Sequence, residues 1–165
     1  MLNSALSSVS RSLGPGDYLL NEPLSEIRTV LGSCVCVFFY HGPSGFYGAA
    51  HFICAYGSTS WRPGMSVNGR YGNQILPFLL QAAKQRGIAP EALTVQIVGG
   101  AMSPEVANLS DDFQVGRSNW QYALSYVQRH GLTLVTVDVG GTCWRKLVID
   151  PQYGLLLSTF LGRGQ

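Results

Sequence analysis

Two apolar segments separated by a short turn lie in the first third of the sequence. Residues 27–40 (IRTVLGSCVCVFFY) and 45–54 (GFYGAAHFIC) are rich in β-branched and aromatic side chains. Between them stands HGPSG at 41–45, whose Gly, Pro and Ser residues favour turns. Runs of this composition on either side of a turn predict a β-hairpin, so the fold must contain a sheet.

Two later segments have the spacing of apolar residues that is typical of amphipathic helices. The first covers roughly residues 73–86, with Asn73 as the expected N-cap and Gly87 just after its end. Pro77 lies inside this segment, so the regular helix could begin only there. The second covers about residues 117–130, where apolar side chains recur at helical spacing.

The remaining apolar runs predict strands. Residues 93–98 and 132–139 each follow a helix and end in a pair of glycines, and 146–150 with 155–160 form a final hairpin. Strands then outnumber helices, and two helices can cover only part of the sheet surface. The sequence therefore predicts an α/β fold, a layered α/β sandwich of mixed sheets with two main helices.

The composition indicates one globular unit without a nucleic-acid partner. The chain has 165 residues, 46% of them hydrophobic, and no linker-like stretch. We expect a single domain over residues 14–165, preceded by a loosely ordered N-terminal segment, residues 1–13. Charged residues make up 12% and the net charge is +2, so there is no cluster of Lys and Arg for nucleic acid.

The sequence also predicts a cytoplasmic protein without membrane insertion. The longest apolar stretch, residues 30–40, is too short to cross a bilayer, and the N-terminus lacks the pattern of a signal peptide. In a reducing compartment the four cysteines are expected to be free thiols.

The predicted hairpin brings a thiol next to an imidazole. If a four-residue loop, 41–44, joins the strands, Cys34 lies directly opposite His51 on one face of the sheet. An imidazole beside a thiol can take its proton and later return it to a leaving amine. Gly32 and Ser33 interrupt the apolar strand, and a bend there would leave backbone N–H groups as oxyanion donors. The inference depends on the register, because a loop one residue longer or shorter would place the two side chains on opposite faces of the sheet.

The same residues also fit a packing role or a metal site. A cysteine in a Val-rich strand is usually a small buried hydrophobe, and Cys36 is expected to be one. A zinc-binding module of Cys34, Cys36, His51 and Cys54 is another alternative, although its spacing departs from the usual zinc-finger patterns.

Six short segments occur in a recognisable order. They are TVLGSCV at 29–35, HF at 51–52, RYG at 70–72, VGGA at 98–101, VGRSN at 115–119, and DVGGT at 138–142 followed by Arg145. In type and order they resemble the CheD family of chemoreceptor glutamine deamidases, and the resemblance extends over about residues 14–157.

This resemblance implies a CheD-like fold, related to that of bacterial toxin deamidases, with a Cys–His–Thr site. Cys34 and His51 match the nucleophile and the base, and Thr29 is the member that orients the imidazole. Along a straight strand Thr29 would face away from Cys34, so we expect a bend at Gly32 and Ser33 to bring it back. Arg117 and Asn119 either cap the second helix or line the site.

The implied activity is hydrolysis of glutamine side chains to glutamate on methyl-accepting chemotaxis receptors, without a metal or other cofactor. The resemblance also implies a CheC-type phosphatase as a further partner. The alternative function is a catalytically degenerate regulatory protein that only binds such a phosphatase.

Overall fold

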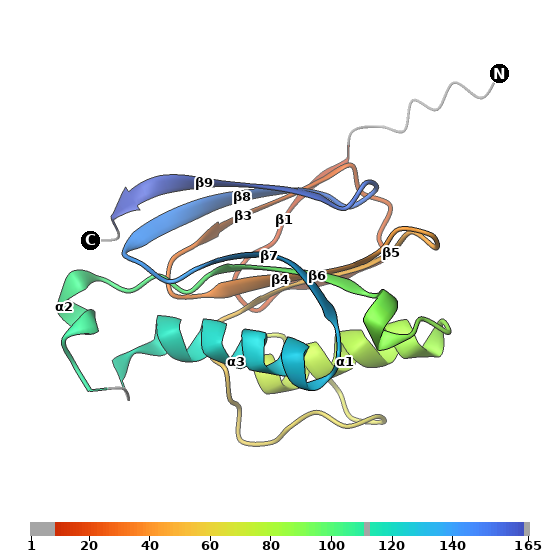
Figure 1. The fold of residues 1–165 in the computed structure, drawn as a ribbon, viewed down its shortest axis with the longest axis horizontal. Coiled ribbons are helices and arrows are strands. Elements are labelled where there is room, and N and C mark those ends of the chain that lie inside the picture. Colours follow the sequence, from red (N-terminus) through yellow and green to blue (C-terminus); the bar gives the residue numbers. More distant parts are fainter. Residues whose placement is uncertain (1–8, 111–112, 164–165) are drawn as a thin grey trace.

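Two β-sheets stack face to face, and helices cover the outer face of one of them (Figure 1). The computed structural model describes residues 9–110 and 113–163.

The four-stranded sheet has the order β1-β3-β8-β9, with β1 (Ser10–Ser12), β3 (Glu26–Leu31), β8 (Cys143–Asp150) and β9 (Leu155–Arg163). The five-stranded sheet has the order β2-β5-β4-β6-β7, with β2 (Tyr18–Leu20), β5 (Phe46–Phe52), β4 (Val35–His41), β6 (Thr94–Gly99) and β7 (Thr133–Val139). The helices are α1 (Gly72–Gln85), α2 (Pro104–Ala107), α3 (Val115–Arg129) and a 3₁₀ turn, η1 (Pro90–Ala92).

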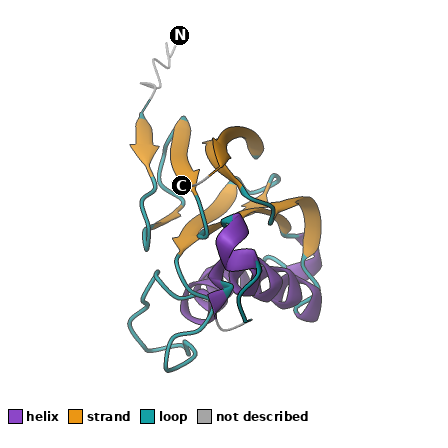
Figure 2. Ribbon diagram, turned by 90° about the vertical axis from the view of Figure 1, so that its left-hand side faces the viewer, coloured by secondary structure: helices purple, strands orange, loops and turns teal. Residues whose placement is uncertain are grey.

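Both sheets are mixed. Strand β1 runs parallel to β3 and β6 runs parallel to β7, whereas the other paired strands are antiparallel. Figure 2 shows the helices together below the stacked sheets, beside the long loop that joins β5 to α1. The predicted layered α/β sandwich with two main helices, α1 and α3, is confirmed.

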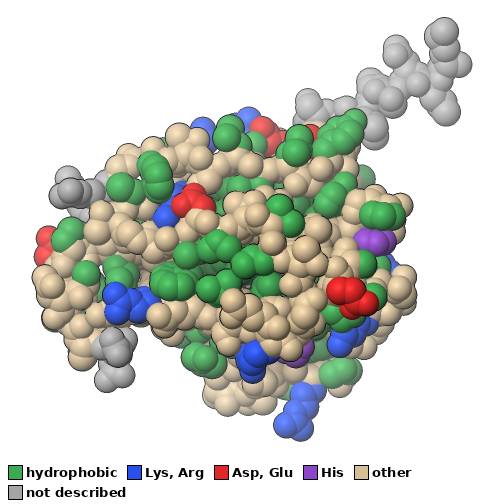
Figure 3. Space-filling view, viewed as in Figure 1, with side chains coloured by type: hydrophobic (Ala, Val, Ile, Leu, Met, Phe, Trp, Pro, Cys, Tyr) green, Lys and Arg blue, Asp and Glu red, His purple; other side chains and the backbone are tan. Residues whose placement is uncertain are grey.

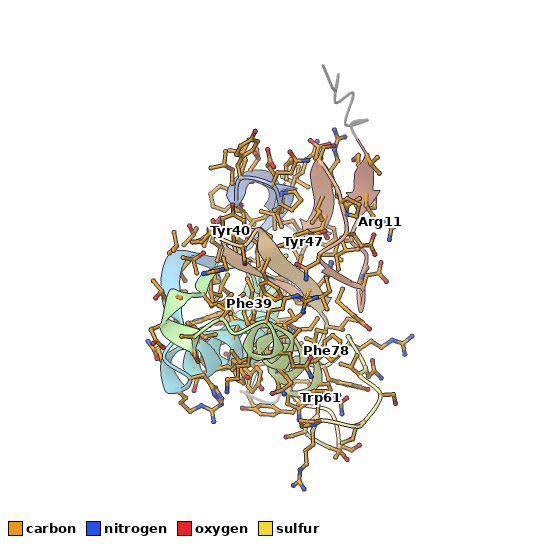
Figure 4. The ribbon with its side chains drawn as sticks, turned by 90° about the vertical axis from the view of Figure 1, so that its right-hand side faces the viewer. Arg11, Phe39, Tyr40, Tyr47, Trp61 and Phe78 are labelled. Atoms are coloured by element: carbon orange, nitrogen blue, oxygen red, sulfur yellow. The ribbon has the colours of Figure 1, made fainter. Side chains whose placement is uncertain are left out.

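The centre of the five-stranded sheet is covered on both faces, which explains the continuous apolar sequence of β4 and β5. Every residue of β5 is buried. Along β4 the side chains alternate, so that Phe39 packs with the helices while Tyr40 faces the four-stranded sheet, as does Tyr47 of β5 (Figure 4). A strand that is buried on both faces reads as an unbroken apolar run, as residues 35–40 do.

The predicted strand over residues 27–40 is two strands in two different sheets. Strand β3 ends at Leu31 in the four-stranded sheet, and β4 begins at Val35 in the five-stranded sheet. The expected bend at Gly32 and Ser33 is therefore present, and it is large enough to carry the chain from one sheet to the other.

The predicted register of the β4–β5 hairpin is wrong by two residues. His41 pairs with Phe46, and Cys36, instead of Cys34, lies directly opposite His51. The reason lies in Gly45, which we placed at the start of the second strand. Gly45 adopts φ 73°, a left-handed conformation that closes the turn and lets its N–H donate to the His41 carbonyl at 2.9 Å. The shift is even, so each side chain keeps its predicted face.

Helix α1 runs through Pro77 and begins earlier than that residue. A proline removes the hydrogen bond to the carbonyl four residues before it, here that of Asn73. The Trp61 N–H donates to this Asn73 carbonyl at 3.0 Å and so satisfies it. Asn73 is also not the N-cap, because Tyr71 occupies that position without a side-chain cap. Among the described residues, no helix is long and apolar enough to cross a membrane.

The ordered fold begins before the predicted boundary at residue 14. Strand β1 pairs with β3, and the Leu13 side chain is buried between the sheets. The first eight residues of the expected loose segment, 1–13, lie outside the described residues.

Strands β7 and β9, at the edges of their sheets, carry exposed apolar side chains such as Val137 and Leu157. Hydrophobic side chains gather across the middle of this face in Figure 3. The Ser158 hydroxyl of β9 donates to Asp138 of β7 at 2.8 Å, which ties the two edges together.

Candidate active site

Cys34 lies at the crossing between the two sheets, directly before β4, and is partly buried. Its carbonyl accepts a hydrogen bond from the Gly100 N–H at 2.9 Å. A Cβ on Gly99 would come within 2.3 Å of the same carbonyl oxygen, and Gly99 has φ 120°. Only glycine fits this close approach, so the glycine pair at the end of β6, Gly99 and Gly100, fixes the backbone of Cys34.

The carbonyls of Gly32 and Ser33 both accept hydrogen bonds, which fix the backbone just before Cys34. The Gly32 carbonyl accepts from the Ala101 N–H at 2.9 Å, and the Ser33 carbonyl accepts from the Asn119 side-chain amide at 3.0 Å. Within the described part of the chain, no acceptor takes the N–H of Ser33 or of Cys34. These two amides could therefore donate to an oxyanion.

A cavity of about 300 Å³ opens beside Ser33. Its lining is mostly apolar and includes Met102, Phe113 and Trp144. Within the described residues, the cavity carries no charged side chain in its lining, so it suits an uncharged group such as a carboxamide and its apolar neighbours.

His51 is held from the opposite sheet. Its side chain, 1% exposed, projects from β5 toward β3, and Nδ1 lies 2.8 Å from the Thr29 hydroxyl and 3.1 Å from the Leu13 carbonyl. The Thr29 hydroxyl in turn lies 2.5 Å from that carbonyl. The expected position of Thr29 next to His51 is thus observed, because the bend places them on facing sheets.

These three contacts determine where the imidazole carries its proton. The Leu13 carbonyl can only accept, so the Thr29 hydroxyl donates to it. The Thr29 oxygen is then free to accept from His51 Nδ1–H. The neutral imidazole therefore has its hydrogen on Nδ1 and its lone pair on Nε2.

The Nε2 atom is buried and has no hydrogen-bond partner among residues 9–110 and 113–163. Burial lowers the pKa of His51 from its ordinary value of 6.5, while the hydrogen bond with Leu13 and the charge of Asp17 oppose that shift. The imidazole is accordingly neutral at neutral pH, with an unused lone pair. This is the state that a general base requires.

The two cysteines near His51 differ in exposure. Cys36 is 1% exposed, and burial raises its pKa from 9.0 to about 12, so its thiol is inert. Cys34 is more accessible, and burial raises its pKa above 9.0 as well. Among the described residues no hydrogen bond joins Cys34 to His51, and the expected approach of the thiol to the imidazole stays a prediction.

The residues of the zinc alternative do not assemble. In the part of the chain that the structure describes, no three His, Cys, Asp or Glu side chains converge as metal ligands. All four cysteines are free.

Two further groups contribute to the site, and of these only Asn119 was expected from the sequence, either to cap the helix or to line the site. The Leu13 carbonyl is a main-chain group, so no residue type signals it. Asn119 lies in α3 and donates to Ser33 and Ile53, whereas Arg117 lines a separate cavity of about 470 Å³ on that helix. Of the two residues near the helix start, only Asn119 reaches the segment that carries Cys34.

Comparisons with known proteins point to the same family as the sequence motifs. A family model described as CheD chemotactic sensory transduction matches residues 57–159. A probable chemoreceptor glutamine deamidase CheD of Pseudomonas syringae pv. tomato is 29% identical over 150 residues, which are 90% of this chain and 88% of that protein. Similar proteins from Chromobacterium violaceum and Shewanella oneidensis are 32% and 30% identical, over 86% and 84% of this chain and 72% and 70% of their own lengths.

Proposed function

This chain belongs to the CheD family, and on that basis we propose that it is a protein-glutamine deamidase that acts on methyl-accepting chemotaxis receptors. Cys34 is the nucleophile, His51 is the general base and Thr29 orients the imidazole. The relatives, probable chemoreceptor glutamine deamidases, support the reaction and the receptor substrate. We also propose a cytoplasmic location, where the four cysteines would stay free thiols.

The reaction proceeds by acyl transfer through Cys34. His51 Nε2 takes the thiol proton, and the sulfur adds to the carboxamide carbon of glutamine. The N–H groups of Ser33 and Cys34 stabilise the negative oxygen of the tetrahedral intermediate. The imidazolium then gives its proton to the nitrogen, ammonia leaves, and a thioester remains.

Water completes the cycle. His51 Nε2 removes a proton from the water, which attacks the thioester carbon. The sulfur departs and regains its proton from the imidazolium, so the products are glutamate and the free enzyme. No step needs an oxidant or a metal ion.

One observation carries this proposal. His51 has its Nδ1 fully engaged by Thr29 and Leu13, while its buried Nε2 has no partner within the described chain. A buried nitrogen without a partner costs stability, and a catalytic role is one explanation for keeping such a group. The reaction requires the Cys34 thiol to reach this nitrogen.

A binding role is the second candidate. The raised pKa of Cys34 and the missing thiol–imidazole hydrogen bond favour a resting site in which the thiolate is not preformed. A regulatory protein that binds a CheC-type phosphatase would be compatible with such a site.

Ammonia release separates the two candidates. The purified protein is incubated with a receptor cytoplasmic fragment, and ammonia is measured with a coupled enzyme assay. Release in proportion to protein concentration supports the deamidase. No release from any receptor fragment, together with binding to a CheC-type phosphatase, would support the regulatory role.

A further inference from the structure

Asn119 connects the two chain segments that carry Cys34 and His51. It is 0% exposed, and its side-chain amide donates one hydrogen bond to the Ser33 carbonyl at 3.0 Å and the other to the Ile53 carbonyl at 2.8 Å. Ser33 precedes Cys34, and Ile53 follows His51 by two residues. Both hydrogens of the amide are thus used on this connection.

The connection lies where the β4–β5 ladder has ended. The last pair of the ladder is Val35 with Phe52, and both carbonyls bound by Asn119 lie beyond it. The ladder itself therefore does not link the two strands at the end where Cys34 stands. The Asn119 amide therefore links the two strands just beyond the last pair of the ladder.

Helix α3 provides a fixed support for this amide. A Cβ on Gly116 would come within 2.4 Å of the Ala101 carbonyl, so the helix lies directly against the chain that follows β6. That same chain holds the carbonyls of Gly32 and Cys34 through the N–H groups of Ala101 and Gly100. Asn119 is thus part of the frame that surrounds the nucleophile.

The amide is not an optimal residue for stability at this position. Its Oδ1 atom is buried and has no hydrogen-bond partner in the described part of the protein. An unsatisfied buried acceptor is unfavourable, and a leucine of similar shape would not carry that penalty. A role that needs the two N–H donors explains the asparagine better than packing does.

We propose that Asn119 is a positioning residue that holds the Cys34 segment and the end of the His51 strand in the relation that lets the thiol reach His51 Nε2. This inference rests on the proposed deamidase function. It adds to that function a residue that holds the backbone next to the nucleophile. Asn119 does not touch the reacting atoms.

The test uses Asn119→Leu, which keeps the shape and removes both donors, and Asn119→Ser, which keeps one donor. Gln96→Leu is the matched control. Gln96 is also buried and its amide donates to the Gly154 carbonyl at 3.1 Å, in the β8–β9 turn beside Tyr40 and away from the site. Both Leu variants thus remove a buried amide–carbonyl connection, and a urea unfolding curve for each shows its effect on stability.

The decisive readout is the reaction of Cys34 with iodoacetamide as a function of pH, followed by peptide mass spectrometry. This readout needs no substrate, so it remains valid even if the wild type releases no ammonia, a result that would count against the proposed function alone. We expect Asn119→Leu to lower the alkylation rate of Cys34 at pH 7 about tenfold and to shift the rise of this rate to higher pH, because the less firmly held thiol reaches His51 Nε2 less often and loses its proton to it less readily.

The activity assay adds a second readout. In Asn119→Leu we expect kcat to fall by about tenfold or more with little change in KM, and Asn119→Ser to recover part of the loss. Should Asn119→Leu fail to fold, Asn119→Ser decides by the same alkylation profile. A profile and kcat that match those of Gln96→Leu would overturn the proposal, because Asn119 would then have only a general structural role.

Discussion

Thr29 and His51 lie on strands of two different sheets, yet the Thr29 hydroxyl oxygen and His51 Nδ1 are 2.8 Å apart. The hydroxyl is committed as a donor to the Leu13 carbonyl, so it can only accept from the imidazole. The sandwich thus fixes the tautomer of His51 by a contact across its interior. This contact and the backbone around Cys34 lead to testable consequences.

Removing the Thr29 hydroxyl should weaken catalysis without removing the nucleophile. We expect Thr29→Ala to lower kcat by about 10- to 100-fold, because Nδ1 loses an acceptor and the imidazole loses its fixed orientation. Thr29→Ser keeps the hydroxyl and should stay within about threefold of the wild type. Steady-state ammonia release measures both variants. Equal rates in Thr29→Ala and the wild type would remove threonine from the site.

The lowered pKa of His51 predicts a specific pH dependence of stability. The unfolded chain protonates His51 near pH 6.5, whereas the folded protein does so only at lower pH. Between these two values the unfolded state binds more protons, so the free energy of unfolding falls as the pH falls through this window. His130 also has a lowered pKa, caused first by burial and then by Arg129 and Lys84.

Two variants separate these histidines. Urea unfolding between pH 5 and pH 7 should show that the free energy of unfolding depends less on pH in His51→Gln than in the wild type. The difference should be about what one titrating group contributes. His130→Gln provides the comparison for a less buried group. If His51→Gln keeps the full pH dependence of the wild type, the buried neutral imidazole is not its source.

The two cysteines of the site region should differ sharply in reactivity. At pH 8 we expect iodoacetamide to modify Cys34 at least about tenfold faster than Cys36, which is buried and has a pKa raised to about 12. Peptide mass spectrometry after a time course distinguishes the two sites. Faster labelling of Cys36 in the folded protein would contradict the assignment of Cys34 as the accessible thiol.

Gly99 should be far less tolerant of a side chain than another glycine of similar conformation. Gly99→Ala places a Cβ 2.3 Å from the Cys34 carbonyl oxygen, whereas Gly162→Ala meets nothing within 4 Å. The two φ angles are similar, 120° at Gly99 and 114° at Gly162, so both variants carry a comparable backbone strain. We expect urea unfolding to show a clearly larger loss for Gly99→Ala, together with loss of activity. Equal losses in the two variants would mean that the contact with Cys34 is unimportant.

Sequence patterns predicted the fold class because the strands and helices are marked by local composition. The two segments around HGPSG, the helices α1 and α3 and the terminal hairpin all follow from runs of apolar residues and turn residues. Gly32 and Ser33 even marked the bend. They could not reveal that the chain changes sheet there, because that depends on the pairing of β3 with β8, more than 100 residues away.

The register and the partners of the site residues depend on geometry that composition does not record. Whether Gly45 closes the turn or opens the strand is a matter of its φ angle. Asn119 meets Ser33 across 86 positions of sequence, and only the packing of α3 on β6 brings them together. The Leu13 contribution is a main-chain carbonyl, which any residue type would supply.

The central claim is that Cys34 attacks glutamine side chains with His51 as its base. Mass spectrometry of a receptor cytoplasmic fragment tests it most directly, with wild type, Cys34→Ala and Cys36→Ala compared at equal concentration and with circular dichroism confirming that each is folded. We predict a mass increase of about one dalton at glutamine with the wild type and with Cys36→Ala, and none with Cys34→Ala. Full conversion by folded Cys34→Ala would contradict the account.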